Sequence, residues 1–232
     1  MNGTLYLIPT VLSEEALHVI PQYVHDITKR LTVFFVEDEK TARRYLRKTG
    51  FTASFDTTVI LPLNEHTDAA TVSTYIHHLK NGNDCGLMSD AGVPAVADPG
   101  SALVQLCHQN GIKIIPLVGP SSILLALMGS GLNGQQFHFH GYIPVKQPMR
   151  KQYIQQMDND ARKGITQIFI ETPYRNNTII QDIISTCNTN TKFCVASDLT
   201  GPKESIRTNE IQYWKKQVPV MEKIPAIFLL GM

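Results

Sequence analysis

The chain has 232 residues, with 21 basic and 20 acidic side chains and a formal net charge of +1 at pH 7. A chain of this length buries about 70% of its unfolded surface, so it needs no metal or disulfide to fold. The near-neutral charge excludes a global electrostatic attraction to nucleic acid, so any RNA contact has to come from local basic patches.

The four cysteines show no C-x-x-C spacing, and Cys85 and Cys194 lie in apolar runs. This usage indicates reduced, buried thiols in a cytosolic protein. The first nine residues lack the basic start and long apolar core of a signal peptide, and Gly, Pro or Ser interrupts every apolar run before 18 residues. We therefore expect a cytoplasmic protein without a membrane span.

Short apolar strands alternate with helical patterns in the first half of the chain. Strands are predicted at residues 4–8, 31–36, 86–88 and 113–117, and helices at 14–24, 40–48, 71–80 and 101–107. This alternation indicates a mostly parallel, doubly wound sheet. We expect a first α/β domain over residues 1–118.

The pattern changes beyond residue 118, where an apolar helix is predicted at residues 123–128. Residues 137–143 alternate with period two, as a half-buried strand does. A basic, polar segment at 146–163 precedes strands at 167–170, 192–196 and 226–230 and a helix at 177–187. We expect a second α/β domain over residues 119–232.

Two Gly- and Pro-rich loops, residues 89–100 and 117–122, each follow a buried strand. Ligands bind at the carboxyl ends of strands in parallel α/β sheets, where glycine lets the backbone approach and serine or carboxylate groups bind hydroxyl or ammonium groups. A ligand there would meet Asp90, Ala91, Gly92, Val93, Ser121 and Ser122. The chain has no G-x-G-x-x-G after its first strand and no P-loop sequence, which argues against an ordinary dinucleotide or P-loop site.

Charged side chains also follow two strands of the second half. Glu171 and Arg175 follow one strand, and Asp198, Lys203 and Glu204 follow another. Such groups are either site residues or helix caps and surface ion pairs.

Two other clusters carry weaker signals. His138 and His140 share one strand face, but no third ligand is near them, so we predict no metal site. A basic helix face either contacts phosphate or is an ordinary solvated surface, and it consists of Arg43, Arg44, Arg47 and Lys48.

Several short motifs occur together in a fixed order, at residues 37–38, 64–66, 89–94, 98–100, 116–121, 141–144, 171–175 and 198–200. In this order they resemble the tetrapyrrole methylase superfamily over roughly residues 30–232. The branch that they resemble most is that of the 16S ribosomal RNA cytidine 2′-O-ribose methyltransferases.

The resemblance implies two α/β domains with S-adenosyl-L-methionine in a cleft between them, usually in a homodimer. It implies transfer of a methyl group to a ribose in the RNA of the small ribosomal subunit. Matching positions place cofactor contacts at Pro9, Asp90, Val93, Ser121, Ser122, Ile170, Ala196 and Ala226.

The chain also departs from the family's pattern. Residues 8–14 lack the Gly-rich loop of the porphyrinogen and precorrin methylases, which argues against a tetrapyrrole substrate. They also lack the Pro-Ile-Gly-Asn-Leu sequence of the ribosomal RNA branch. Positions 39, 40 and 201 are Glu, Lys and Gly, where that branch favours Thr, Arg and Lys.

Methyl transfer from a sulfonium needs little dedicated chemistry, because the leaving group is already activated and the protein mainly aligns the nucleophile and excludes water. A ribose hydroxyl must still lose its proton, and the candidate acceptors are Glu171, Asp198 and Lys203. Candidate RNA contacts are Lys146, Arg150 and Arg175. Two alternatives remain: a methyltransferase for a tetrapyrrole or another small molecule, and a member that binds the cofactor or RNA without catalysis.

Overall fold

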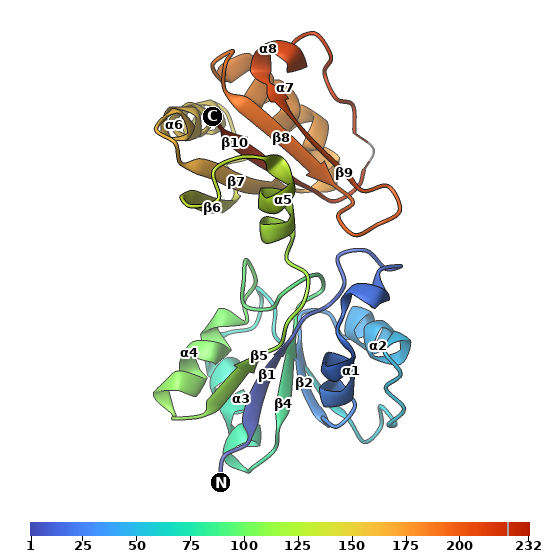
Figure 1. Ribbon diagram of the computed structural model, residues 1–232. Coiled ribbons are helices and arrows are strands. Elements are labelled where there is room, and N and C mark those ends of the chain that lie inside the picture. Colours follow the sequence, from blue (N-terminus) through green and yellow to red (C-terminus); the bar gives the residue numbers. More distant parts are fainter. Residues whose placement is uncertain (222) are drawn as a thin grey trace. The chain divides into compact units, whose positions relative to one another are not determined.

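The computed structural model describes residues 1–221 and 223–232. The chain divides into two compact units, Met1–Ser121 (unit 1) and Ser122–Met232 (unit 2). Each unit has its own five-stranded sheet within the described residues (Figure 1). No helix in this described part is long and apolar enough to cross a membrane.

Unit 1 is a parallel sheet with helices on both faces. Its strands are β1 (Thr4–Ile8), β2 (Val33–Val36), β3 (Val59–Pro62), β4 (Cys85–Met88) and β5 (Lys113–Pro116). Their order is β3-β2-β4-β1-β5, and each neighbouring pair is parallel. The helices are the short 3-10 helix η1 (Leu17–Val19), α1 (Gln22–Thr28), α2 (Glu39–Lys48), α3 (Ala69–Lys80) and α4 (Ser101–Gln109).

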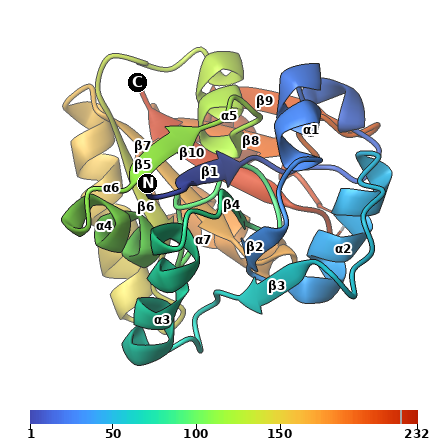
Figure 2. The same cartoon turned by 90° about the horizontal axis from the view of Figure 1, so that it is seen from below.

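The two faces of this sheet follow from strand periodicity. Every residue of β2 is buried, with Val33 and Phe35 in the cluster under α3 and α4, and Phe34 and Val36 in the cluster under α1 and α2. Figure 2 shows the two helix pairs on opposite sides of the sheet. A strand covered on both faces is apolar throughout, which explains the continuous run at residues 33–36.

Unit 2 contains a mixed sheet. Its strands are β6 (Phe137–Tyr142), β7 (Thr166–Glu171), β8 (Lys192–Ser197), β9 (Ser205–Glu210) and β10 (Ala226–Gly231). Their order is β6-β7-β10-β8-β9, with β6 and β7 parallel and the other pairs antiparallel. Its helices are α5 (Ser122–Ser130), α6 (Met149–Arg162), the short 3-10 helix η2 (Pro173–Arg175), α7 (Asn176–Thr186) and α8 (Ile211–Trp214).

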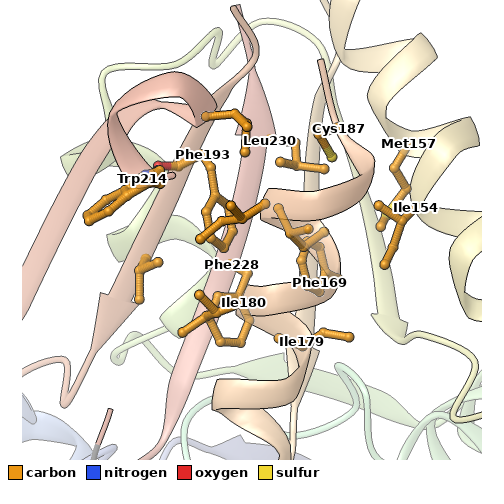
Figure 3. Close-up of a cluster of buried hydrophobic side chains, with 14 of the residues drawn as sticks. Ile154, Met157, Phe169, Ile179, Ile180, Cys187, Phe193, Trp214, Phe228 and Leu230 are labelled. Carbon is orange, nitrogen blue, oxygen red and sulfur yellow. The ribbon is translucent and has the colours of Figure 1, made fainter. Parts of the chain in front are cut away.

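The core of unit 2 packs aromatic rings of its sheet together with aliphatic side chains of α6 and α7 (Figure 3). The Phe228 ring stacks between Phe169 and Phe193, at centroid distances of 5.4 and 6.0 Å. Trp214 packs in the same cluster, and its indole N–H donates to the Phe193 carbonyl at 2.8 Å. The buried indole therefore has its hydrogen-bond partner, as a buried tryptophan requires.

Three sequence predictions of local structure were wrong or incomplete. The helix predicted at residues 14–24 does not form, because Pro21 lacks an N–H and instead occupies the N-cap of α1, after the separate turn η1. The strands β3 and β9 were not predicted, since β3 is a partly exposed edge strand and β9 has a polar sequence. The basic, polar segment at residues 146–163 contains the helix α6.

The four cysteines are free and buried, as the sequence predicted. Burial raises the pKa of the Cys85 thiol to about 12 and that of Cys107 to about 11. These thiols therefore stay protonated near neutral pH and pack as small apolar groups.

We expect Phe228→Ala to destabilise unit 2 by about 3–5 kcal/mol, because it removes the central ring of a closely packed cluster. The measurement is urea unfolding followed by tryptophan fluorescence, since the single Trp of the chain, Trp214, lies in this cluster. Phe137→Ala is the matched control, since Phe137 is 42% exposed. Equal midpoints for the two variants would contradict the packing described here.

Candidate functional site

The parallel pairing in unit 1 brings several loops to one edge of its sheet. We call them the carboxyl-edge loops of unit 1, and they comprise residues 9–13, 37–38, 63–68, 89–100 and 117–121. The predicted contacts Pro9, Asp90, Ala91, Gly92, Val93 and Ser121 all lie on these loops. Loops at this edge are the usual ligand-binding position of such a sheet.

Two of these loops are joined directly by Thr10. Its N–H donates to the Gly92 carbonyl at 2.8 Å, and its buried hydroxyl donates to the Ser89 carbonyl at 3.2 Å. Gly92 has a φ of +79°, a conformation that glycine adopts without strain. The Tyr45 hydroxyl of α2 donates to the Pro9 carbonyl at 2.9 Å. Pro9 and the loop around Gly92 are thereby fixed side by side.

A third loop packs on the same proline. A Cβ atom added at Gly119 would overlap Cβ and Cγ of Pro9, so only glycine permits this approach. Ser121 follows at the end of unit 1 and is half-buried, while Ser122 opens α5 in unit 2.

Glu37, at the end of β2, fixes the position of Asp90. The Glu37 carboxylate accepts the Asp90 backbone N–H at 3.1 Å. Burial raises the pKa of the Asp90 carboxyl to about 6, and the negative charges of Glu37 and Asp38 add to this effect. A nearby cation would therefore stabilise the charged form of the Asp90 carboxyl. Ala91 is exposed and Val93 half-buried beside it.

Asp98 shapes the long loop after β4. Both of its carboxylate oxygens accept the Ala95 N–H at 2.8 Å, and Oδ1 also accepts the Gly100 N–H at 2.8 Å. These bonds support two residues with positive φ, Ala95 at +66° and Ala97 at +60°. Asp98 thus supports the loop from within.

Sequence reasoning did not assign roles to Thr10, Tyr45 and Glu37. The position of Glu37 could have indicated a role, because it is a carboxylate directly after a buried strand, like the candidates Glu171 and Asp198. Thr10 and Tyr45 act through backbone carbonyls of other segments, and nothing in their local sequence indicates those partners.

Unit 2 has a comparable edge, where β7 and β8 end and β10 begins. Two rows of neighbours cross the strands there: Ile170, Ile227 and Ala196 in one row, and Glu171, Ala226 and Ser197 in the next. Successive residues of a strand point to opposite faces, so Ile170 and Ala196 lie on one face and Ala226 on the other. The structure brings these three predicted contacts together at one end of the sheet.

Glu171 and Arg175 form an ion pair at this edge. The Glu171 side chain is fully buried, and the same oxygen that binds Arg175 accepts the Thr172 N–H at 2.7 Å. The Arg175 side chain stays 30% exposed. The pair fixes the turn η2 and leaves part of the guanidinium at the surface.

The loop after β8 folds around Asp198. Asp198 and Thr200 have φ values of +48° and +66°, and the Asp198 carboxylate accepts the Lys203 N–H at 2.8 Å. The Thr200 N–H donates to Glu204 at 2.6 Å. A Cβ atom at Gly201 would overlap the Asp198 carboxylate. Asp198 and Lys203 are therefore adjacent, at the same edge as Glu171.

The predicted RNA contacts Lys146 and Arg150 differ in their surroundings. Lys146 is exposed. Arg150 is only 11% exposed: its Nε lies 2.7 Å from Oδ2 of Asp182, and Nη1 donates to the Val145 carbonyl at 2.7 Å. A substrate contact by Arg150 would have to break this ion pair.

His140 is occupied by hydrogen bonds within unit 2. Its Nδ1 pairs with the Tyr153 hydroxyl at 2.8 Å, and its Nε2 pairs with the Gln167 side-chain oxygen at 2.7 Å. Burial lowers the pKa of this imidazole. Residues 1–221 and 223–232 contain no group of three His, Cys, Asp or Glu arranged for a metal ion.

The basic face of α2 is bound to neighbouring groups of unit 1. Arg44 and Lys48 both bind Glu14, at 3.0 and 3.1 Å. Arg43 pairs with Glu39, and the Arg47 guanidinium lies 4.1 Å from the centroid of the Phe55 ring. These cations are anchored within the unit.

The sequence is similar to that of several named proteins over most of its length. Ribosomal RNA small subunit methyltransferase I of Vibrio cholerae is 32% identical over 209 residues, which cover 89% of this chain and 69% of the relative. The proteins of the same name from Buchnera aphidicola (Schizaphis graminum) and Escherichia coli O157:H7 are 30% and 28% identical, each over 93% of this chain and 73% of the relative. No family model matches the chain.

The chain belongs to the ribosomal RNA small subunit methyltransferase I family. It is a methyltransferase, and the family resemblance drawn from the sequence motifs is confirmed. Solved structures support the predicted fold: the methyltransferase CobJ matches with a TM-score of 0.65 at 16% identity, covering 99% of this chain and 94% of that one. Uroporphyrin-III C-methyl transferase from Thermus thermophilus, complexed with S-adenyl homocysteine, matches with a TM-score of 0.58 at 16% identity, covering 99% and 97%.

We expect Gly119→Ala to destabilise unit 1 of this methyltransferase by roughly 1–3 kcal/mol, because the added methyl group forces the loop away from Pro9. Thermal unfolding followed by circular dichroism measures the change. Gly134→Ala is the control, since a Cβ there meets no atom within 4 Å. A loss no larger than that of the control would refute the close approach at Gly119.

Proposed function

We propose that this methyltransferase transfers the methyl group of S-adenosyl-L-methionine to the 2′-hydroxyl of a ribose in the RNA of the small ribosomal subunit. The observation that carries the proposal is the 32% identity, over 89% of the chain, to a protein named ribosomal RNA small subunit methyltransferase I. The ribose as acceptor rests on the branch of the family that the motifs resemble.

The residues of unit 1 suit this cofactor. S-Adenosyl-L-methionine supplies a methyl group on a positively charged sulfur and also carries an ammonium group. Glu37, Asp38 and Asp90 place negative charge at the carboxyl-edge loops, and a bound cation would stabilise the charged form of Asp90, whose pKa is raised to about 6. Gly119 packs directly on Pro9, where any larger residue would clash.

The proposed cofactor contacts come from both units. Unit 1 supplies Pro9, Asp90, Ala91, Gly92, Val93 and Ser121, and unit 2 supplies Ser122, Ile170, Ala196 and Ala226. In unit 1 the hydrogen bonds of Thr10 and Glu37 hold these groups in place before the ligand arrives, which lowers the entropy cost of binding.

The acceptor hydroxyl must lose a proton, and we propose that this happens at the edge of unit 2 where Glu171, Asp198 and Lys203 lie. Glu171 uses one carboxylate oxygen for Arg175 and for the Thr172 N–H, while its other oxygen is buried and has no hydrogen-bond partner within the described part of the chain. Asp198 uses Oδ2 for the Lys203 N–H. The carboxylates of Glu171 and Asp198 can take up a proton directly, whereas Lys203 can do so only as a neutral amine.

The proposal includes a homodimer that works in the cytoplasm, where ribosomal subunits are assembled. Light scattering of the purified chain tests the dimer, and a mass equal to that of one chain would overturn it. Fractionation of the source cells tests the location.

We expect purified enzyme and methyl-labelled S-adenosyl-L-methionine to label small ribosomal subunits taken from a strain that lacks this gene. Mass spectrometry of RNA digests should find about one label per subunit, on a single ribose. Subunits from the unaltered strain are the control and should accept little label, since their site is already methylated. No label on subunits or free RNA, with cofactor binding confirmed, would overturn the RNA proposal, and label on a porphyrinogen would redirect it to small molecules.

We expect Asp90→Asn to weaken cofactor binding measured by calorimetry, while Glu15→Gln, an exposed carboxylate of the same unit, leaves it unchanged. In the wild type, affinity should rise about tenfold from pH 5 to pH 7, because a pKa of about 6 leaves only about a tenth of Asp90 ionised at pH 5. The affinity rises with pH because a cationic ligand binds more tightly to the charged carboxylate. An unchanged slope in Asp90→Asn would exclude Asp90 as the titrating group.

A further inference from the structure

Tyr174 is a large aromatic side chain that lies almost entirely at the surface. It is 79% exposed, in the turn η2 that follows β7. The ion pair of Glu171 and Arg175 and the 2.9 Å hydrogen bond from the Arg175 N–H to the Thr172 carbonyl fix this turn. The ring is therefore presented to solvent by a rigid backbone rather than by a loose loop.

The segment before β10 holds a cation against this ring. The side-chain amide of Asn176 donates to the Ile224 carbonyl at 2.9 Å. Asn177 exchanges two bonds with Met221, at 2.8 and 3.0 Å. These contacts tie Met221 and Ile224 to the start of α7, and Lys223 Nζ lies 5.1 Å from the centroid of the Tyr174 ring. The cation and the ring form one unit, supported from two separate stretches of chain.

The sheet topology adds further cations at the same edge. β6 and β7 are parallel, and β10 runs antiparallel to both β7 and β8, so the ends of β6, β7 and β8 and the start of β10 share one edge. The segments there carry Lys146, Arg175, Lys203 and Lys223, and these cations lie among the carboxylates Glu171, Asp198 and Glu204. Unit 1 differs, since its corresponding edge carries Glu37, Asp38, Asp90 and Asp98.

We infer that Tyr174 is the stacking platform for an unpaired base of the RNA substrate, with Lys223 beside it for the phosphate backbone. Proteins bind single-stranded RNA by stacking bases on exposed aromatic rings next to cations. The inference rests on the proposed function for its substrate class, and it places the contact with RNA on unit 2. Lys223 covers the ring from one face, so the base stacks on the other.

The test compares two probes that carry equal charge. One is a single-stranded cytidine decaribonucleotide, and the other is a decamer of the same phosphate number built from abasic residues. Tyr174→Ala should weaken binding of the cytidine decamer about tenfold or more and leave the abasic decamer unchanged. Tyr174→Phe should restore the affinity, since the ring and not the hydroxyl stacks. Lys223→Ala should weaken both probes alike.

Phe137→Ala is the matched control, since Phe137 is also an exposed ring of unit 2 but lies at the opposite end of its sheet. It should leave both probes unchanged. Methyl transfer to small ribosomal subunits should show a raised KM and a nearly unchanged kcat in Tyr174→Ala, with unchanged cofactor affinity. Tryptophan fluorescence during urea unfolding confirms that each variant is folded.

The outcomes separate this inference from the proposed function. If wild-type enzyme labels the subunits but Tyr174→Ala binds both decamers like the wild type, the inference is wrong and the function stands. If base-dependent binding requires Tyr174 but no RNA is labelled, the stacking role stands and the RNA methylation proposal fails. A changed mass of Tyr174→Ala in light scattering, with unchanged RNA binding, would instead make the ring a contact between protein chains and overturn the inference.

Discussion

The parallel pairing of β1 with both β4 and β5 is the constraint on which unit 1 depends. Parallel strands require the chain to leave each strand at the same edge and return across a face, so the loops after these three strands must share a small space. Their backbone groups then have to satisfy one another, as the bonds between Thr10 and the loop of Gly92 do. The glycine at position 119 follows from the same crowding.

The two units differ in the side chains that they carry at their edges. The loops of unit 1 bring carboxylates together until the pKa of Asp90 rises to about 6, which is an unfavourable arrangement until a cation arrives. Such an edge suits a small sulfonium compound and repels a polyanion. Unit 2 carries Lys146, Lys203 and Lys223 at its edge, among the carboxylates Glu171, Asp198 and Glu204 and together with an exposed aromatic ring. Cations and carboxylates therefore lie together at the edge of unit 2, whereas the carboxyl-edge loops of unit 1 carry carboxylates without Lys or Arg.

The sequence predicted the buried strands well, because a strand covered on both faces is an uninterrupted apolar run; residues 4–8 are found as predicted, and β4, β7, β8 and β10 differ by a residue or so at their ends. The edge strands β3 and β9 were missed, because β9 is polar and the apolar run of β3 is only four residues long and ends at Pro62. The helix at residues 14–24 failed because Pro21 outweighed the apolar pattern.

The candidate site shows the same difference between what local sequence indicates and what it does not. Candidates placed by strand ends, such as Glu171 and Asp198, lie at one edge of unit 2. Charge alone did not reveal that Arg150 is held by Asp182, since that contact joins residues 32 positions apart in sequence, on α6 and α7. Long-range partners of this kind depend on packing that no local pattern records.

The loop after β8 couples the residue at position 201 to the carboxylate at position 198. Gly201 stands where the ribosomal RNA branch favours lysine, and the Asp198 carboxylate fills the space that a Cβ atom would take. That carboxylate also accepts the Lys203 N–H, so it cannot move aside without losing this bond. Positions 198 and 201 are therefore coupled, and a lysine graft at 201 is tolerated only together with a rebuilt turn. In this turn, a side chain at position 201 and the bond from the Lys203 N–H to Asp198 therefore compete for the same carboxylate position.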